Sequence, residues 1–207
     1  DTAVMGGYAT QVTLKPQEHY GRFWAIPALG SAVKNIMLIP HQFLIYFVGI
    51  WVTLNHLWLW IPVLFTGKYP AYGVRLMDGY MRWNMRMYSY LFGLTDTYPP
   101  FGFGGDLYPV NVTTVPPTAP NRFWAIPVLG IGIKEIILIP HIVVLAILYV
   151  AVMLCELILW IPVLFTGHFP DWGLDLIGGT MAWTVRVFSY AYGLTDKYPP
   201  FSMQLAI

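Results

Sequence analysis

The chain has 207 residues, of which 57% are hydrophobic and 10% charged, and its formal net charge is +1. Soluble domains carry about 25% charged residues, so this composition excludes an ordinary water-soluble protein and predicts an integral membrane protein. A net charge so close to zero also argues against a nucleic-acid partner.

The chain repeats itself at an offset of 100 residues, without a gap. Four stretches of the first copy return unchanged in the second: residues 22–27 at 122–127, 38–41 at 138–141, 60–67 at 160–167 and 98–101 at 198–201. Chance does not produce this pattern, so one unit was duplicated and both copies should share a fold. The predicted fold class is an all-α membrane protein with a tandem internal repeat, a common architecture for membrane proteins.

In chain order, we expect an N-terminal arm, a first membrane repeat, a linker, a second membrane repeat and a C-terminal tail, at residues 1–20, 21–101, 102–121, 122–201 and 202–207. The arm is polar, which predicts a segment that is flexible or docked on a partner. The linker is rich in Gly and Pro, which stop helices and favour extended backbone.

Each copy begins with two predicted parts. The first, at residues 22–34 and 122–134, holds Trp and Pro between two basic residues and suits a helix lying at the membrane interface. The second, at 36–65 and 136–165, is apolar and longer than the roughly 20 residues that span the hydrocarbon core. It therefore spans with tilt or bends at its prolines, and Gly67 is well placed to cap the helix of the first copy.

The third part of each copy, at residues 71–94 and 171–194, carries charged residues at helical spacing. The charges are Arg75, Asp78, Arg82 and Arg86 in the first copy, and Asp171, Asp175 and Arg186 in the second. This pattern predicts an amphipathic helix lying in the membrane interface. A Tyr-Pro-Pro-Phe sequence then ends each copy, because neither proline can extend a helix.

Two topologies remain open. One span per copy makes the copies inverted, and the positive-inside rule then places the basic middle segment, residues 68–134, in the cytoplasm. If each long run instead bends into a hairpin, the chain crosses four times, the copies are parallel and all charged parts share one face.

A polar stripe on the first long run includes His56, and Glu156 takes the equivalent place in the second run. An ionisable residue inside a bilayer is costly, so each should find a partner. One hypothesis is a buried pair that relays protons or binds an ion; the other is a hydrogen-bonded pair that holds the helices together, or contacts to another subunit. Contact between the two side chains goes with parallel copies, and separation goes with inverted ones.

His41 and His141 each follow a proline, once per copy. A neutral imidazole near a helix start can hold a metal, a haem iron or a chlorophyll magnesium, which makes these two the candidate cofactor-binding residues. The alternative is an interfacial histidine that bonds backbone groups freed by the proline. We otherwise predict no cofactor and no metal site.

Asp96 and Asp196 lie in a repeated Leu-Thr-Asp-x-Tyr-Pro-Pro-Phe sequence, either as a docking element for a partner or lipid headgroups, or as part of a helix stop. Four arginines are predicted to meet lipid phosphate rather than an anionic substrate: Arg75, Arg82, Arg86 and Arg186. The sequence has no P-loop, dinucleotide fingerprint, nucleophile elbow or cysteine–histidine cluster, so we expect no catalytic residue and no enzyme.

The sequence Trp-Ile-Pro-Val-Leu-Phe-Thr-Gly-x-(Tyr/Phe)-Pro, followed by an amphipathic helix and Gly-Leu-Thr-Asp-x-Tyr-Pro-Pro-Phe, resembles a bacterial membrane domain family of unknown function, often present as tandem copies. The resemblance covers both units. It implies a bacterial membrane protein, which we expect to be a multi-pass protein of the inner (cytoplasmic) membrane, and it implies no activity, substrate or cofactor.

These features predict a non-catalytic accessory or scaffold subunit of a larger membrane assembly, with the lipid bilayer and other membrane subunits as partners. Two apolar helices are too few to enclose a pathway alone, and the polar arms suit docking. One alternative is a pigment- or haem-carrying subunit that uses His41 and His141. The other is a small ion or proton transport component that uses His56 and Glu156.

Overall fold

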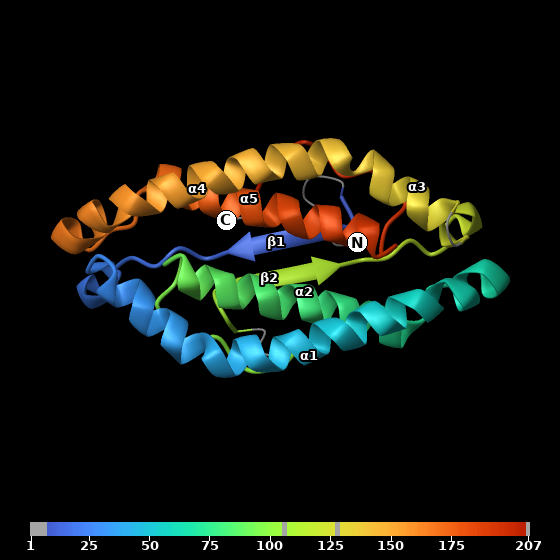
Figure 1. Cartoon of the computed structure of the whole chain (residues 1–207), viewed down its shortest axis with the longest axis horizontal. Helices are drawn as coiled ribbons and strands as arrows, with labels where there is room; N and C mark the ends of the chain where they lie inside the picture. Colours follow the sequence, from blue (N-terminus) through green and yellow to red (C-terminus); the bar gives the residue numbers. More distant parts are fainter. Residues whose placement is uncertain (1–7, 105–106, 127–128, 206–207) are drawn as a thin grey trace.

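Helices make up most of the computed structural model, which describes residues 8–104, 107–126 and 129–205. In chain order the elements are β1 (Thr10–Leu14), the 3-10 turn η1 (Arg22–Ala25), α1 (Leu29–Thr66), α2 (Ala71–Leu91), β2 (Val110–Thr114), the 3-10 turn η2 (Arg122–Ala125), α3 (Gly130–Ile137), α4 (Ile139–Thr166) and α5 (Asp171–Ala191). Figure 1 shows the two strands along the middle, with α2 and then α1 on one side, and α5 and then α4 on the other.

The two copies are inverted relative to one another. β1 and β2 pair antiparallel, with Val12 opposite Val112 at the centre of the ladder. In Figure 1, α1 and α4 run along the long axis in opposite directions. Neither long run folds back on itself, since α1 and α4 are each one continuous helix. The hairpin alternative, with parallel copies and four crossings, is therefore wrong.

The long helices differ from the predicted boundaries at their starts. α1 already begins at Leu29 and runs through Pro40 and Pro62, so the predicted interfacial segment reduces to η1 and the first turns of α1. In the second copy the helix is interrupted at Leu138, between α3 and α4. Gly67 ends α1 in the left-handed conformation, with φ of 67°, which confirms the predicted cap.

A two-stranded sheet corrects the all-α expectation. β1 lies in the predicted arm, and β2 lies in the predicted linker. The two strands keep the 100-residue offset, so the structural repeat begins upstream of the predicted repeat boundaries. Alternation explains the strands, because in β1 the side chains of Thr10, Val12 and Leu14 are buried while Thr13 is exposed. The predicted arm, linker and tail include residues 1–7, 105–106 and 206–207, which lie outside the described residues.

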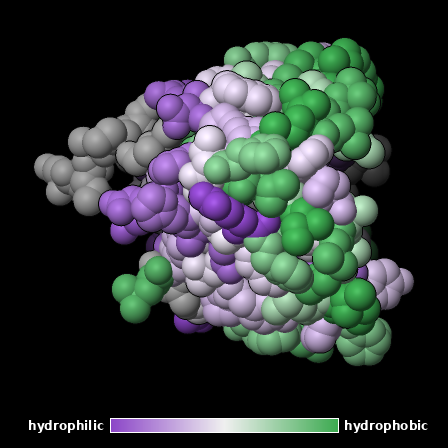
Figure 2. Space-filling view, turned by 90° about the vertical axis from the view of Figure 1, so that its left-hand side faces the viewer, coloured by the Kyte–Doolittle hydropathy of each residue, from purple (hydrophilic) through white to green (hydrophobic). Residues whose placement is uncertain are grey.

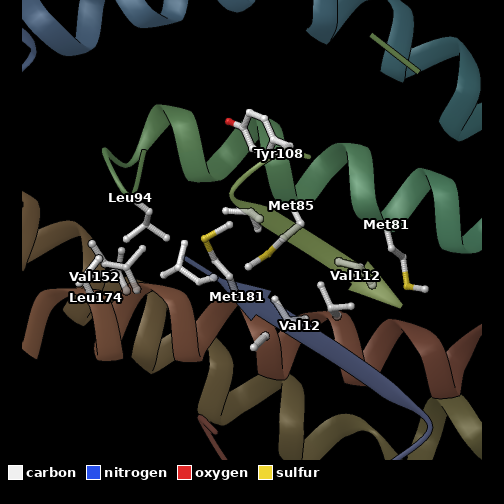
Figure 3. Close-up of a cluster of buried hydrophobic side chains, with 14 of the residues drawn as sticks. Val12, Met81, Met85, Leu94, Tyr108, Val112, Val152, Leu174 and Met181 are labelled. Carbon is white, nitrogen blue, oxygen red and sulfur yellow. The ribbon is translucent and has the colours of Figure 1, made fainter. Parts of the chain in front are cut away.

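The core lies between the sheet and the two middle helices. Figure 3 shows Val12 and Val112 of the strands close to Met85 of α2 and Met181 of α5, in one buried cluster. Methionines suit this place because an unbranched thioether fills irregular gaps between a flat sheet and round helices. Both copies contribute to this cluster, so neither copy buries its apolar face alone.

α2 and α5 therefore lie inside the fold, and they are not separate amphipathic helices whose polar faces are free to meet headgroups. Both are amphipathic helices, as the spacing of their charged residues predicted. Each packs against one strand and one long helix, and the two helices also pack against one another. The mid-helix residues Met77 and Ile177 are fully buried. The buried arginines of these helices, Arg82, Arg86 and Arg186, donate to backbone carbonyls of the strands, the loops or the C-terminal segment, whereas Arg75, Asp171 and Asp175 are exposed.

The long helices form the outside of the molecule. Each buries one narrow stripe and exposes apolar side chains over the rest of its length, among them Ile39, Phe43, Phe47, Leu54 and Leu57 on α1, and Ile142, Ile147, Val150, Leu154 and Leu157 on α4. By length and composition, α1 and α4 are able to cross a membrane. Figure 2, which looks along the long axis, shows hydrophilic residues gathered on one side of the molecule and hydrophobic residues on the opposite side.

Candidate functional site

Two equivalent pockets lie at opposite ends of the molecule, each built from both copies. One copy provides a Trp and a Lys from its start and an Asp from its end, and the second half of the other copy's long helix provides an ionisable residue and a second Trp. We call them the Lys34 pocket and the Lys134 pocket. The Lys34 pocket has a volume of about 670 Å³ and the Lys134 pocket about 30 Å³, so the two copies have diverged here.

The Lys34 pocket is organised by an ion pair. Lys34 is 3% exposed, its Nζ lies 3.5 Å from Oδ1 of Asp96, and it also lies over the rings of Trp24 and Tyr90, at 5.5 and 4.9 Å. Oδ2 of Asp96 accepts from the backbone N–H of Gly21 at 2.6 Å. The aromatic rings and the carboxylate offset only part of the cost of removing the ammonium group from water.

The Lys134 pocket repeats this arrangement. Nζ of Lys134 lies 4.0 Å from Asp196 and over the rings of Trp124 and Tyr190, at 5.6 and 4.6 Å. Asp196 accepts from the backbone N–H of Asn121 at 2.6 Å. Burial lowers the pKa of Lys134 to about 8, although the charge of Asp196 acts in the opposite direction. Asp96 and Asp196 are thus internal ion-pair partners that hold the start of each copy against its end.

His56 and Glu156 do not form the predicted pair. Glu156 lines the Lys34 pocket, and its charge interacts with that of Lys34. His56 lines the Lys134 pocket, where its ring packs against Tyr192 at 5.7 Å. Inversion of the copies is the reason, because it carries equivalent positions on the two long helices to opposite ends. Among the described residues, Oε1 of Glu156 is buried without a hydrogen-bond partner.

His41 and His141 each lie in an aromatic box. Nδ1 of His41 accepts from Nε1 of Trp83 at 2.8 Å, and one face of the imidazole stacks on Phe101 at 3.8 Å. The second copy repeats both contacts, with Trp183 at 2.9 Å and Phe201 at 3.9 Å, and both histidines are 0% exposed. Trp83 is therefore the partner of Nδ1, and not the backbone freed by Pro40 as the alternative hypothesis expected.

This hydrogen bond fixes the protonation of the imidazole. An indole N–H only donates, so Nδ1 accepts and the proton of a neutral ring lies on Nε2. A neutral imidazole that binds a metal through Nε2 carries its proton on Nδ1, where it would face the indole N–H of Trp83. In the described part of the chain, no three His, Cys, Asp or Glu side chains are grouped as a metal site requires.

Three of the four arginines predicted to meet lipid phosphate lie inside the fold. Arg82 donates to the carbonyls of Val112 and Phe103, at 2.8 and 3.1 Å, and pairs with Asp78. Arg86 is fully buried and donates to the carbonyl of Val110 at 3.1 Å. Strand carbonyls thus take the place of headgroups. Burial raises the pKa of Asp78, against the charge of Arg82 beside it.

The second copy follows the same pattern. Arg186 is 5% exposed and donates to the carbonyls of Ser202 and Gln204, so the C-terminal segment completes its contacts. Arg75 is the exposed member of the four arginines.

Sequence reasoning missed several residues that organise these sites. Lys34, Trp83 and Phe101 were not singled out, yet each is identical in the second copy at a position 100 residues later. These residues could have been found from the sequence, because a charged or aromatic side chain that is identical in both copies stands out where the two copies otherwise differ.

A family model described as a domain of unknown function (DUF4389) matches residues 31–102 and again residues 129–203. The two matches agree with the expected tandem duplication of a domain of unknown function. No curated protein and no solved structure matches the chain.

Proposed function

We propose a function for this chain, which belongs to the family of a domain of unknown function, DUF4389. From its own geometry, we infer that it is a non-catalytic accessory or scaffold subunit of a larger bacterial membrane protein assembly. Its location is the bacterial inner membrane. The partners are lipid, which contacts the apolar faces of α1 and α4, and other protein subunits of the assembly.

One observation carries the proposal: the lysine, aspartate and arginine side chains that lie inside the fold bond to the chain itself, and the two Lys–Asp pairs do so in the same way in both copies. Lys34 faces Asp96, and Lys134 faces Asp196. Arg82, Arg86 and Arg186 donate to backbone carbonyls. A catalytic group must face a substrate, whereas these groups hold the two copies, the strands and the loops together. Such a rigid inverted repeat with an apolar exterior is suited to a structural role.

The experiment is a two-step affinity purification of the tagged chain from its host membrane in mild detergent, followed by quantitative mass spectrometry. The proposal predicts one or more membrane proteins at a fixed ratio to the chain after both steps, and absent from a purification of an unrelated tagged membrane protein. A chain that elutes alone as a monomer, both in detergent and in lipid nanodiscs, contradicts the proposal.

The pigment or haem alternative is less well supported by the geometry. Trp83 already donates to Nδ1 of His41, which leaves the proton of the neutral ring on Nε2, and Phe101 covers one face of the ring. Nε2 itself is buried and has no hydrogen-bond partner among the described residues. An absorption spectrum of the purified protein tests this alternative: a haem or chlorophyll band that disappears in His41→Ala would favour it.

The ion or proton transport alternative has one observation in its favour. Glu156 lines the 670 Å³ Lys34 pocket and has a buried Oε1 without a hydrogen-bond partner among the described residues. The equivalent position in the other pocket holds His56, so the two ends differ in charge. Ion flux into liposomes that is equal for wild type and Glu156→Gln would remove this alternative.

A further inference from the structure

We propose that the protein lies flat in one leaflet: α1 and α4 run parallel to the membrane plane with their apolar faces among acyl chains, and the outer face of the β1–β2 sheet stays in water. The proposal rests on the membrane location proposed above. It replaces the two crossings that the length of the long helices suggests.

The sheet is the first reason. The side chains on its outer face are all polar, and Thr13 and Thr113 are exposed there. The sheet lies beside the middle of α2, since Arg82 and Arg86 donate to the carbonyls of Val112 and Val110. α2 in turn packs along α1. If α1 crossed the membrane, this small sheet would lie at the depth of the hydrocarbon core, where open sheet edges are not found.

The length of the helices is the second reason. The apolar run of α1, residues 36–65, is about 45 Å long at 1.5 Å per residue. Fitting it into a core of about 30 Å requires a tilt of about 48°, beyond the usual range of about 0–40°. A helix that lies in the plane of the membrane meets no such limit. Residues 36–67 hold no Asp, Glu, Lys or Arg, so no charged side chain on this stretch requires water.

The distribution of hydropathy is the third reason. A protein that spans a membrane along its long axis has polar ends and an apolar surface all around its middle. Figure 2, viewed along that axis, instead shows polar residues on one side and apolar residues on the opposite side. This is the distribution of a large amphipathic body, and the occupant that fits a continuous apolar face without charges is the acyl-chain region of one leaflet.

The test uses matched single-cysteine variants of the full chain, in a background where Cys155, the single native cysteine, is replaced by alanine. Lys68→Cys and His168→Cys follow the caps of α1 and α4, and because these helices are antiparallel the two sites lie at opposite ends. Thr113→Cys reports on the outer face of the sheet, and Leu54→Cys reports on the apolar face of α1. Each variant is labelled with a membrane-impermeant maleimide in spheroplasts and in inside-out vesicles.

The proposal predicts that Lys68→Cys, His168→Cys and Thr113→Cys all label from the same side of the membrane, at least tenfold more than from the other side. Leu54→Cys should label only after detergent is added. Labelling of the two ends from opposite sides would overturn the flat arrangement in favour of a crossing. Protection of Thr113→Cys from both sides would overturn the water-facing sheet, and indicate that a protein covers it.

A flotation assay separates this inference from the membrane location on which it rests. Wild type and each variant are mixed with vesicles of phosphatidylethanolamine and phosphatidylglycerol and centrifuged in a density gradient. Wild-type protein that stays at the bottom would contradict the membrane location, and the flat arrangement with it. Protein that floats, but labels its two ends from opposite sides, would contradict the flat arrangement alone.

Discussion

Glu156 and His56 take the same position in two copies of one pocket, but they lie at opposite ends of the molecule. Each faces the lysine of the other copy, Glu156 beside Lys34 and His56 in the pocket of Lys134. This relationship follows from inversion, which turns a position shared by two repeats into two distant sites.

A pair of double-mutant cycles tests this separation. Glu156→Gln and His56→Ala should have additive effects on the free energy of unfolding in detergent, within about 0.5 kcal/mol, because the two sites share no partner. Glu156→Gln and Lys34→Met should instead couple by about 0.5–3 kcal/mol, because the two charges share one pocket. Coupling in the first cycle and additivity in the second would contradict the inverted arrangement.

The hydrogen bonds that the indoles of Trp83 and Trp183 donate to His41 and His141 should contribute to stability. Trp83→Phe keeps a ring but leaves Nδ1 of the buried His41 without its donor, so we expect a loss of about 1–3 kcal/mol in the free energy of unfolding. Trp183→Phe should behave in the same way, through His141. Trp58→Phe is the matched control, since Trp58 is 66% exposed and should change stability by no more than about 0.5 kcal/mol. Equal effects at all three positions would contradict the role of the hydrogen bond.

The start of α1 depends on a glycine for steric reasons. A Cβ on Gly30 would lie 2.1 Å from the carbonyl oxygen of Trp24, and backbone cannot move aside cheaply. Gly30→Ala should therefore destabilise the protein by about 2 kcal/mol or more in thermal denaturation, or prevent folding.

Gly132→Ala is the control for this prediction. A Cβ at Gly132, in the first turn of α3, meets no atom within 4 Å. Alanine is the better helix former, so this change should stabilise by about 0.5–1 kcal/mol. A Gly30→Ala variant as stable as wild type would show that η1 and α1 do not pack as described.

The buried charge of Lys134 predicts a dependence of stability on pH. Burial lowers its pKa to about 8 from the usual value of 10.5 for lysine, so between these values the unfolded chain holds more protons than the folded one. Below pH 8 the buried Lys134 is charged in the folded protein, and its desolvation lowers the free energy of unfolding. This destabilisation disappears as the pH rises to 10.5, the pKa of the lysine in the unfolded chain. The free energy of unfolding should therefore rise above pH 8, by at most about 1.4 kcal/mol per pH unit.

Denaturation of wild type and Lys134→Met between pH 7 and pH 9.5 checks this prediction. The difference between the two curves should change across this window, because the variant lacks the titrating group. Lys68→Met removes an exposed lysine and should follow the wild-type curve. Parallel curves for wild type and Lys134→Met would contradict the buried charge.

The sequence predicted the repeat, the long helices and the αL cap at Gly67, because these depend on local pattern. It did not predict the sheet, because a strand of five residues such as Thr10–Leu14 is stable only against a partner, here 100 residues away. The spacing of Arg82 and Arg86 predicted a helix with a polar face. It carried no information on whether that face meets headgroups or strand carbonyls.

The candidate site was predictable only in part. Glu156, His56, Asp96 and Asp196 were singled out as unusual residues, and all four line the two end pockets. The pockets themselves could not be predicted, because each forms between copies and depends on their inversion. The sequence pattern places Lys34 at the polar end of an interfacial segment, because the burial of a lysine against Trp24 produces no periodic pattern in the sequence.

Native mass spectrometry of the assembly, released directly from host membrane vesicles, is the most direct test of the proposed accessory role. The account predicts that the chain is detected in a complex, with a mass that equals the chain plus an integer number of other protein subunits, and that the free chain is a minor species. A spectrum that shows only one copy of the chain with bound lipid would contradict the account.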